Sequence, residues 1–424
     1  MNRLLRSVIE SVVKTGDLTI TDPEGVLHHF GDRTGSPVHV LIKTKQAERA
    51  IAFDPTLHLA EAFMDEEVDF LQGDVLALLK LLYNNSAWSN SQFGRSLDLV
   101  RNLFKRFQQL NSQKRSRENV HRHYDLSGEL YKLFLDEDMQ YSCAYFERPD
   151  MTLEEAQAAK KRHIAAKLDL KPGQNVLDIG SGWGGMGLYL ARDFGVDVLG
   201  VTLSTEQHAV STERVHDEAL ENHVHFELRD YRSLSERFDR IVSVGMFEHV
   251  GVNHFKTFFD TAATLLKPDG VMVLHSIGRN GPPYATNPFI RKYIFPGGYI
   301  PSLSEVLPFI ERAGLMVTDI EILRHHYADT LKAWRERFLL NRERAKAIYD
   351  ERFCRMWEFY LSGSEAAFRW QDMMVFQIQI TKRNDVLPVT RDYIYERDHA
   401  TPLPLLPESI SPRRQRTRKR ADQD

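Results

Sequence analysis

The sequence contains few cysteines, no long apolar run and no excess of one charge. Only Cys143 and Cys354 occur, in a spacing that fits neither a zinc motif nor a redox pair, so we expect a reducing, cytoplasmic environment, no disulfide scaffold and no metal site. The most apolar stretch, residues 75–83, is shorter than the roughly 20 residues of a membrane span. Lys and Arg total 55 against 59 Asp and Glu, a net charge of -4, so no nucleic-acid partner is expected.

The length of the chain, 424 residues, suits two or three domains. Residues 1–110 combine an amphipathic N-terminal helix with short apolar runs separated by turn residues, which predicts a small α+β module. The expected strands are 18–21, 26–30, 38–43 and 50–53, and a helix is expected over 75–83.

A basic helix is expected at residues 93–110, at the end of this module. An apolar stripe is accompanied there by Arg95, Arg101, Lys105 and Arg106. The stripe can equally pack on the second domain, but the charges favour an anionic membrane surface, so we expect peripheral association with the inner face of a membrane.

Helices and strands alternate from residue 153 to residue 381, which predicts an α/β domain with a parallel sheet and helices on both faces. A Gly- and Pro-rich insertion over 278–302 is typical of a lid or pocket wall. Helices are expected over 330–345 and 347–361. The catalytic domain is therefore placed at 111–390, and the basic tail 391–424 is predicted to be disordered.

The most informative motif, Val-Leu-Asp-Ile-Gly-Ser-Gly-Trp-Gly-Gly, runs from 176 to 185 and joins a buried strand to a helix through glycines. It satisfies G-x-G-x-x-G, which also occurs in NAD sites. An NAD site requires an acidic residue at the end of the next strand, whereas that strand ends at Thr202. Asp178, two residues before the first glycine, is instead typical of S-adenosylmethionine methyltransferases.

Several further motifs resemble the cyclopropane-fatty-acyl-phospholipid synthase family. They are Tyr-Ser-Cys-Ala-Tyr-Phe at 141–146, Gly-Val-Thr-Leu-Ser at 200–204, a segment ending Phe-Glu-His-Val-Gly at 251, Leu-His-Ser-Ile-Gly at 274–278, Tyr-Ile-Phe-Pro-Gly-Gly at 293–298 and Ala-Trp-Arg-Glu-Arg-Phe at 333–338. The resemblance covers residues 121–382, and more loosely residues 1–110. It implies a Rossmann-like class I methyltransferase sheet and methylene transfer from S-adenosylmethionine to a cis double bond of an unsaturated phospholipid.

The resemblance also implies a bound bicarbonate ion that accepts the proton lost during ring closure. Its ligands would be Cys143, Glu248, His275, the backbone of Ile277, and Tyr327. Each has an ordinary structural alternative: a small buried thiol, a charge near a helix start, a core histidine or a surface aromatic. Together they offer donors and a carboxylate around one small anion.

Cofactor contacts carry over to the glycine loop and its neighbours: Tyr141, Ser142, Gly180, Ser181, Gly182, Thr202, Leu203, Gln207 and Tyr231. Two positions depart from the family pattern, because Ser181 and Ser364 stand where cysteine is common. A methyl-branched or exomethylene product, and a non-catalytic lipid-binding relative, remain alternatives. A homodimer is left open.

Overall fold

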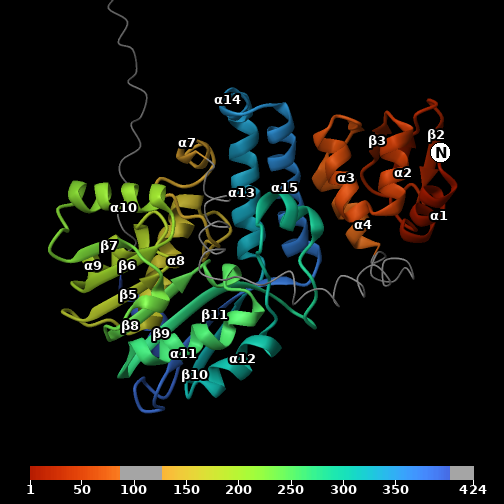
Figure 1. The fold of residues 1–424 in the computed structure, drawn as a ribbon. Helices are drawn as coiled ribbons and strands as arrows, with labels where there is room; N and C mark the ends of the chain where they lie inside the picture. The colour runs from red at the N-terminus through yellow and green to blue at the C-terminus, as the bar shows by residue number, and fades with distance from the viewer. Residues whose placement is uncertain (86–126, 402–424) are drawn as a thin grey trace, which may run out of the picture.

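The computed structural model describes residues 1–85 and 127–401, which form a small N-terminal module and a larger domain (Figure 1). The module contains a four-stranded sheet in the order β2-β1-β3-β4, in which β1 is parallel to β3. Its strands are β1 (Leu18–Thr21), β2 (Leu27–Phe30), β3 (Val38–Ile42) and β4 (Val68–Gln72). Its helices are α1 (Arg3–Val12), α2 (Lys45–Phe53), α3 (Pro55–Met64) and α4 (Val75–Asn84).

The predicted strand at residues 50–53 is wrong, because these residues end helix α2. The Thr44 side chain accepts a hydrogen bond from the Ala47 backbone N–H at 3.0 Å, which caps the helix. Ala47 and Ile51 are buried four residues apart on one face. A short apolar run is compatible with either element, and here the cap and the helical spacing decide.

The larger domain is built on a seven-stranded sheet in the order β10-β11-β9-β8-β5-β6-β7. Strands β9, β8, β5, β6 and β7 are parallel, and β11 is antiparallel to both β9 and β10. The strands are β5 (Asn175–Ile179), β6 (Asp197–Thr202), β7 (Val224–Leu228), β8 (Phe238–Val244), β9 (Leu266–Arg279), β10 (Met316–Leu323) and β11 (Met373–Thr381). The expected α/β class is confirmed.

Helices cover both faces of this sheet (Figure 1). The helices of the larger domain are α7 (Gly128–Tyr131), α8 (Leu153–Leu168), α9 (Gly185–Phe194), α10 (Thr205–Asp217), α11 (Phe255–Leu265), α12 (Leu303–Arg312), α13 (His326–Leu340), α14 (Arg342–Ile348), α15 (Glu351–Trp370) and α16 (Asp392–Ala400). Short helical turns lie at Tyr231–Ser233, Phe247–His249, Val252–His254 and Ile290–Ile294. Two helices are expected over 330–361, but the structure has three, α13, α14 and α15. The helical path is interrupted near Asn341 and again at Asp350, which caps the start of α15.

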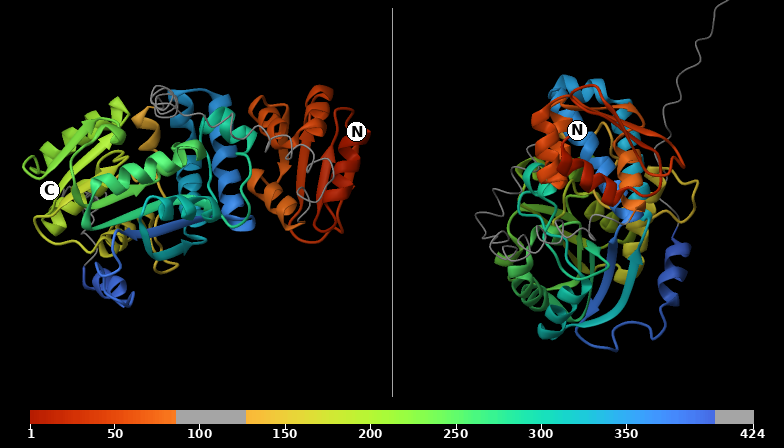
Figure 2. Two further views of the ribbon diagram at one scale, coloured as in Figure 1. Left: turned by 60° about the horizontal axis from the view of Figure 1, so that its bottom comes forward. Right: turned by 90° about the vertical axis from the view of Figure 1, so that its right-hand side faces the viewer.

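The long helix α15 joins the two domains, with α13 beside it (Figure 2). It packs on α3 and α4 of the N-terminal module. Arg355 on α15 donates to Asp69 at 2.7 Å and to the Phe63 carbonyl at 3.0 Å. Glu61 on α3 accepts from Lys292 at 2.6 Å and from the Tyr293 hydroxyl at 2.8 Å. The module is therefore held against the larger domain by buried apolar contacts within a polar rim.

The predicted disorder of the tail is wrong for residues 392–400, which form helix α16. Tyr393 and Ile394 are buried in a cluster with Ala166 of α8. Asp398 accepts from Arg162 Nε at 2.6 Å and lies 2.8 Å from His163 Nδ1. These apolar and ionic contacts order a segment that looked too polar to pack.

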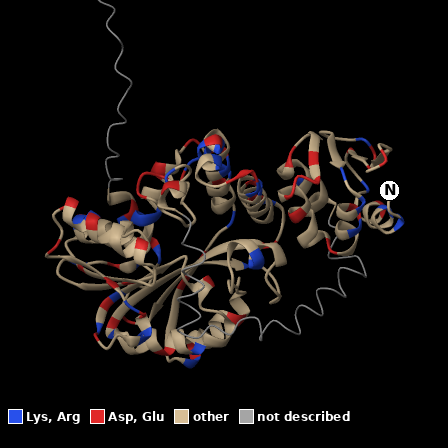
Figure 3. Cartoon of the chain, turned by 45° about the horizontal axis from the view of Figure 1, so that its top comes forward, with Lys and Arg blue, Asp and Glu red and all other residues tan. Residues whose placement is uncertain are grey.

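The predicted basic helix at 93–110 and the tail residues 402–424 lie outside the described residues. In the described part, acidic and basic residues are interspersed over both domains (Figure 3). None of the helices of 1–85 and 127–401 is long and apolar enough to cross a bilayer.

Candidate active site

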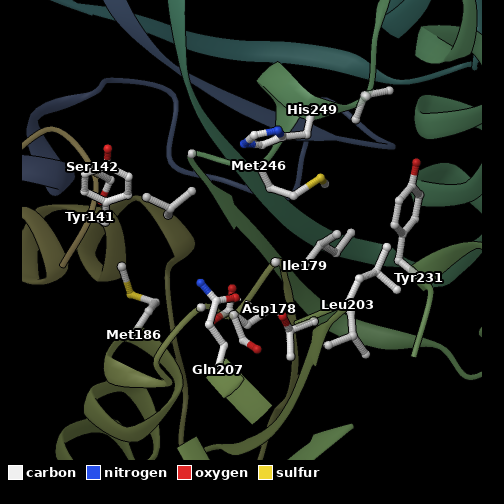
Figure 4. Close-up of a pocket in the computed structure, with 18 of the residues that line it drawn as sticks. Tyr141, Ser142, Asp178, Ile179, Met186, Leu203, Gln207, Tyr231, Met246 and His249 are labelled. Carbon is white, nitrogen blue, oxygen red and sulfur yellow. Dashed lines mark hydrogen bonds between the residues drawn. The ribbon is translucent and has the colours of Figure 1, made fainter. Parts of the chain in front are cut away.

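A pocket lies at the carboxyl ends of β5, β6 and β8, where ligands bind in open α/β sheets. All nine predicted cofactor residues line it. Figure 4 shows Tyr141 and Ser142 on one side and Leu203 and Tyr231 on the other, with Asp178 and Gln207 between them. This elongated layout is compatible with the amino-acid group of S-adenosylmethionine at one end and adenine at the other.

The glycine loop after β5 gives the pocket its floor. Gly180, Gly182 and Gly184 have positive φ values of 83°, 54° and 88°, which L side chains rarely adopt. A Cβ atom at Gly180 would lie 2.6 Å from Met246 Cγ, so this position has no room for a side chain. A Cβ at Gly182 would meet no protein atom within 4 Å, so Gly182 opens onto the pocket.

Two polar side chains in the pocket are available to a ligand. Asp178 Oδ2 is buried with no hydrogen-bond partner, and burial raises the pKa of this carboxyl to about 7. A bound cation, such as the sulfonium or ammonium group of S-adenosylmethionine, would favour the ionised form of Asp178 over the protonated form. Thr202 donates to Gln207 Oε1 at 3.0 Å, which directs the Gln207 amide nitrogen to another partner.

Lys160 on α8 holds the segment that contains Tyr141 and Ser142, and it is not among the residues predicted from the sequence. Its Nζ donates to Ser142 Oγ at 2.8 Å and to Gln140 Oε1 at 2.6 Å. Burial lowers the Lys160 pKa to about 8. Its position in the polar run Lys-Lys-Arg-His suggests a solvated helix face, so no sequence signal distinguished it.

A second, larger cavity of about 1200 Å³ meets the first pocket. Both are lined by Tyr141, Ser142, Gly245 and His249. All five residues predicted to hold the anion line the larger cavity: Cys143, Glu248, His275, Ile277 and Tyr327. Residues 282–290 and 298–300 of the insertion form part of its wall, as expected for this segment. His249 at the junction was missed, although it follows Glu248 directly.

Glu248 is held at this junction by one carboxylate oxygen. Its Oε1 accepts from the Ile277 backbone N–H at 2.6 Å, while Oε2 is buried with no partner. Burial is the main cause that raises the Glu248 pKa to about 7, against smaller opposing effects of hydrogen bonds from the backbones of Ile277 and Glu248 and from the Ser276 side chain. The free oxygen and the raised pKa suit a group that exchanges a proton with a ligand.

The other side chains predicted to hold the anion are neutral hydrogen-bonding groups. Burial holds the pKa of the His275 imidazole well below its usual range and raises that of the Cys143 thiol, so both are uncharged at neutral pH. Tyr327 is buried, with its ring against Trp334 and Phe368. We name Cys143, Glu248, His275, Ile277 and Tyr327 the anion cage. Across residues 1–85 and 127–401, no cluster of His, Cys, Asp or Glu has a geometry for a metal ion.

The raised pKa of Glu248 predicts a pH-dependent stability difference for Glu248→Gln. Between the usual pKa of 4.5 and about 7, only the folded state holds the proton, so raising the pH favours unfolding of the wild type. Glutamine cannot ionise, so the variant gains about 3 kcal/mol over the wild type above pH 7. Denaturant unfolding at acidic and alkaline pH measures this gap. A gap that does not grow with pH contradicts the burial of this carboxyl.

Comparisons with known proteins agree with this site. The family described as Mycolic acid cyclopropane synthetase matches residues 111–378, and a domain of unknown function matches residues 5–92. The chain is 38% identical to a cyclopropane-fatty-acyl-phospholipid synthase of Escherichia coli over 82% of this chain and 88% of that protein. It is also 38% identical to a tuberculostearic acid methyltransferase of Mycobacterium tuberculosis over 63% of this chain and 65% of that one.

A solved structure is similar as well. A mycolic acid cyclopropane synthase complexed with SAH and CTAB is 37% identical, with a TM-score of 0.59, over 62% of this chain and 97% of that one. The resemblance inferred from the sequence is therefore confirmed: the chain belongs to the mycolic acid cyclopropane synthetase family and is an S-adenosylmethionine-dependent methyltransferase.

Proposed function

We propose that this enzyme transfers a methylene group from S-adenosylmethionine to the cis double bond of an unsaturated phospholipid acyl chain, forming a cyclopropane ring. One observation carries the proposal: a cofactor pocket and a large, mostly apolar cavity meet beside the anion cage. A methyl donor and an alkene can therefore face each other next to Glu248. The similarity to the Escherichia coli synthase supports the same substrate class.

The reaction needs alignment and exclusion of water more than strong polar catalysis, because an alkene is a weak nucleophile. The alkene takes the methyl carbon, the C–S bond breaks, and S-adenosylhomocysteine leaves. Positive charge remains on the second alkene carbon until a methyl proton is lost and the ring closes. The rings of Tyr327 and Phe368 line this part of the cavity and can stabilise the cation.

The anion cage fits a bicarbonate ion. The unpartnered Glu248 Oε2 can accept the acid proton of bicarbonate, and the neutral His275 and Tyr327 side chains can donate to its oxygens. The Cys143 thiol donates to the Ala144 carbonyl at 3.2 Å and must turn away from it to donate to the ion. When bound there, bicarbonate supplies a proton acceptor beside the alkene. The residues of this chain hold the ion, keep it away from bulk water and fix its distance from the acyl chain.

A methyl-branched product is the second candidate, because the tuberculostearic acid methyltransferase is equally identical over a shorter stretch. The two outcomes share the same cation: loss of a methyl proton closes the ring, whereas a saturated methyl branch also needs a hydride donor. All five cage residues lie on one cavity, which favours loss of the proton and ring closure. The open cofactor pocket favours catalysis over lipid binding alone.

The product assay is incubation of the enzyme with S-adenosylmethionine and vesicles of monounsaturated phospholipid. We expect acyl chains heavier by one CH2 group, with release of S-adenosylhomocysteine, only when the cofactor is present. Fatty-acid mass spectrometry measures the gain. Release of S-adenosylhomocysteine without heavier acyl chains contradicts the phospholipid substrate.

We also propose that the basic segment at 93–110, which is known here from sequence alone, holds the enzyme on the inner, anionic face of a membrane. Each cation near such a surface contributes about 1 kcal/mol, which salt weakens. Charge reversal of Arg101, Lys105 and Arg106 is expected to reduce co-sedimentation with anionic vesicles, whereas reversal of the exposed Lys256 is not. Binding that is indifferent to lipid charge, salt and these substitutions contradicts the proposal.

A further inference from the structure

The large cavity does not end at the anion cage but continues into the N-terminal module. Its far end is lined by inward-facing side chains of β1 and β3: Leu18, Ile20, Val40 and Ile42. These residues are only 2–5% exposed, so this end of the cavity lies within the core of the module. Protein interiors rarely leave voids larger than a water molecule, so an unfilled space against the inner face of this sheet indicates a ligand.

A passage between the two ends is formed by small residues on α15. Gly363, Ser364 and Ala367 all line the cavity where this helix faces α4. A Cβ atom built on Gly363 would meet only Leu79, at 3.9 Å. Larger side chains here would narrow the connection between the anion cage and the module.

The lining changes in character along the cavity. Its charged residues, among them Glu248, Arg279 and Asp372, belong to the catalytic domain. The module contributes almost entirely Leu, Ile and Val, with no charged side chain among its described lining residues. At about 1200 Å³ the cavity exceeds the roughly 300–1000 Å³ of ordinary small-ligand sites.

We propose that the N-terminal module, a domain of unknown function, encloses the methyl-terminal part of the acyl chain whose double bond lies at the anion cage. The proposal rests on the proposed function and adds a role for the module: it accommodates the carbons beyond the double bond. An uncharged end, lined by buried aliphatic side chains, suits a hydrocarbon terminus better than a headgroup. Each methylene displaced from such a site costs roughly fourfold in affinity, or about 0.8 kcal/mol.

The test uses the full chain with Ile20→Trp, which fills the far end, and Gly363→Leu, which narrows the passage. Leu71→Trp is the matched control, because Leu71 is 58% exposed on β4. The substrates are phospholipids with myristoleoyl, palmitoleoyl or oleoyl chains, which differ only in length beyond the double bond. We expect Ile20→Trp to lower turnover of oleoyl chains by roughly tenfold or more relative to myristoleoyl chains.

Equal losses on all three chains, or none, would overturn the proposal. Fluorescence of cis-parinaric acid gives a second readout that needs no catalysis. Ile20→Trp and Gly363→Leu should weaken its binding, and Leu71→Trp should not. If the wild type makes no product, the proposed function fails, yet this binding comparison still decides whether the cavity holds an acyl chain. Unchanged S-adenosylmethionine binding shows that the larger domain is folded, and an unchanged unfolding transition by circular dichroism shows the same for the module that contains Ile20.

A separate observation concerns a buried polar chain that ends at His275. Lys167 Nζ donates to Glu321 Oε2 at 2.5 Å and to Gln377 Oε1 at 2.7 Å. Gln377 Nε2 lies 3.1 Å from His275 Nδ1. His275 and Gln377 face each other directly across β9 and β11, and Lys167, Gln377 and His275 are all buried.

These contacts determine where the His275 proton lies. A lysine ammonium offers only donors, so the Gln377 oxygen faces Lys167 and its NH2 group faces the imidazole. The ring must then accept at Nδ1 and carry its proton on Nε2. We propose that Lys167 and Gln377 are positioning residues that keep Nε2–H of His275 as a donor for the anion cage. That this N–H group donates to a bound anion rests on the proposed function.

Gln377→Glu tests this, because a carboxylate of the same shape must accept from Nδ1–H and so reverses the tautomer. NMR of histidine-labelled protein, with His275 assigned by its loss in His275→Gln, reports the tautomer without turnover. We expect Nε2–H in the wild type, Nδ1–H in Gln377→Glu, and a roughly tenfold or greater fall in kcat with unchanged cofactor affinity. Nδ1–H in the wild type would overturn the assignment, whatever the activity. Gln377→Asn, which keeps the amide, should retain more activity than Gln377→Glu.

Discussion

Replacing Glu248 with glutamine is expected to lower turnover by roughly 100- to 10,000-fold, the range typical of losing a proton-transfer group. The amide keeps the shape of the side chain and can still accept from the Ile277 N–H. It removes the unpartnered carboxylate oxygen on which the anion cage depends. Steady-state kinetics on monounsaturated vesicles measures the loss, and calorimetry should show that S-adenosylmethionine still binds.

Glu365→Gln is the matched control, because Glu365 is also buried but pairs with Arg335 and Arg369 outside the cage. We expect it to affect stability more than turnover. Removing bicarbonate from the assay should slow the wild type and have little further effect on Glu248→Gln. Wild-type turnover in the Glu248→Gln variant would remove this residue from the mechanism.

The second large effect is expected for Gly182→Val, which should weaken S-adenosylmethionine binding by about 100-fold or more, nearly 3 kcal/mol. A branched side chain at this position projects into the cofactor pocket. Valine at a φ of 54° also strains the backbone, so the loss of stability must be measured separately from the loss of cofactor binding.

Gly173→Val separates the two effects. Gly173 has a φ of 75° and, like Gly182, no atom within 4 Å of a built Cβ, but it does not line the pocket. Both variants should lose similar stability in denaturant unfolding, whereas only Gly182→Val should lose cofactor affinity in calorimetry. Equal cofactor affinity in the two variants would mean that the loop is not the cofactor floor.

The glycine loop and the strand–helix alternation could be predicted from the sequence because each depends on local chemistry. Gly180 and Gly182 mark backbone conformations that other residues rarely adopt, and each strand of the parallel sheet is a continuous run of mostly apolar residues. The position of Ile277 beside Glu248 could not be derived this way. It depends on β9 lying next to β8, which only the family resemblance suggested.

Helix α8 shows why other features were missed. Its sequence is rich in lysine and alanine, yet nearly all of its residues are buried. Lys161 pairs with Asp138, and His163 with Asp398 and Glu321, residues far apart in the chain. Burial of charge depends on such distant partners, which periodicity does not reveal. The ordered helix α16 was missed for the same reason.

In the proposed reaction, a proton is taken from the transferred methyl group beside the anion cage, and the ring then closes. This reaction is tested most directly with S-adenosylmethionine carrying a fully deuterated methyl group. We expect a product in which a CD2 group bridges the two former alkene carbons, seen by mass spectrometry and placed in the ring by NMR. A product that retains all three deuterium atoms in a methyl branch, or carries two of them as an exomethylene group, would contradict it.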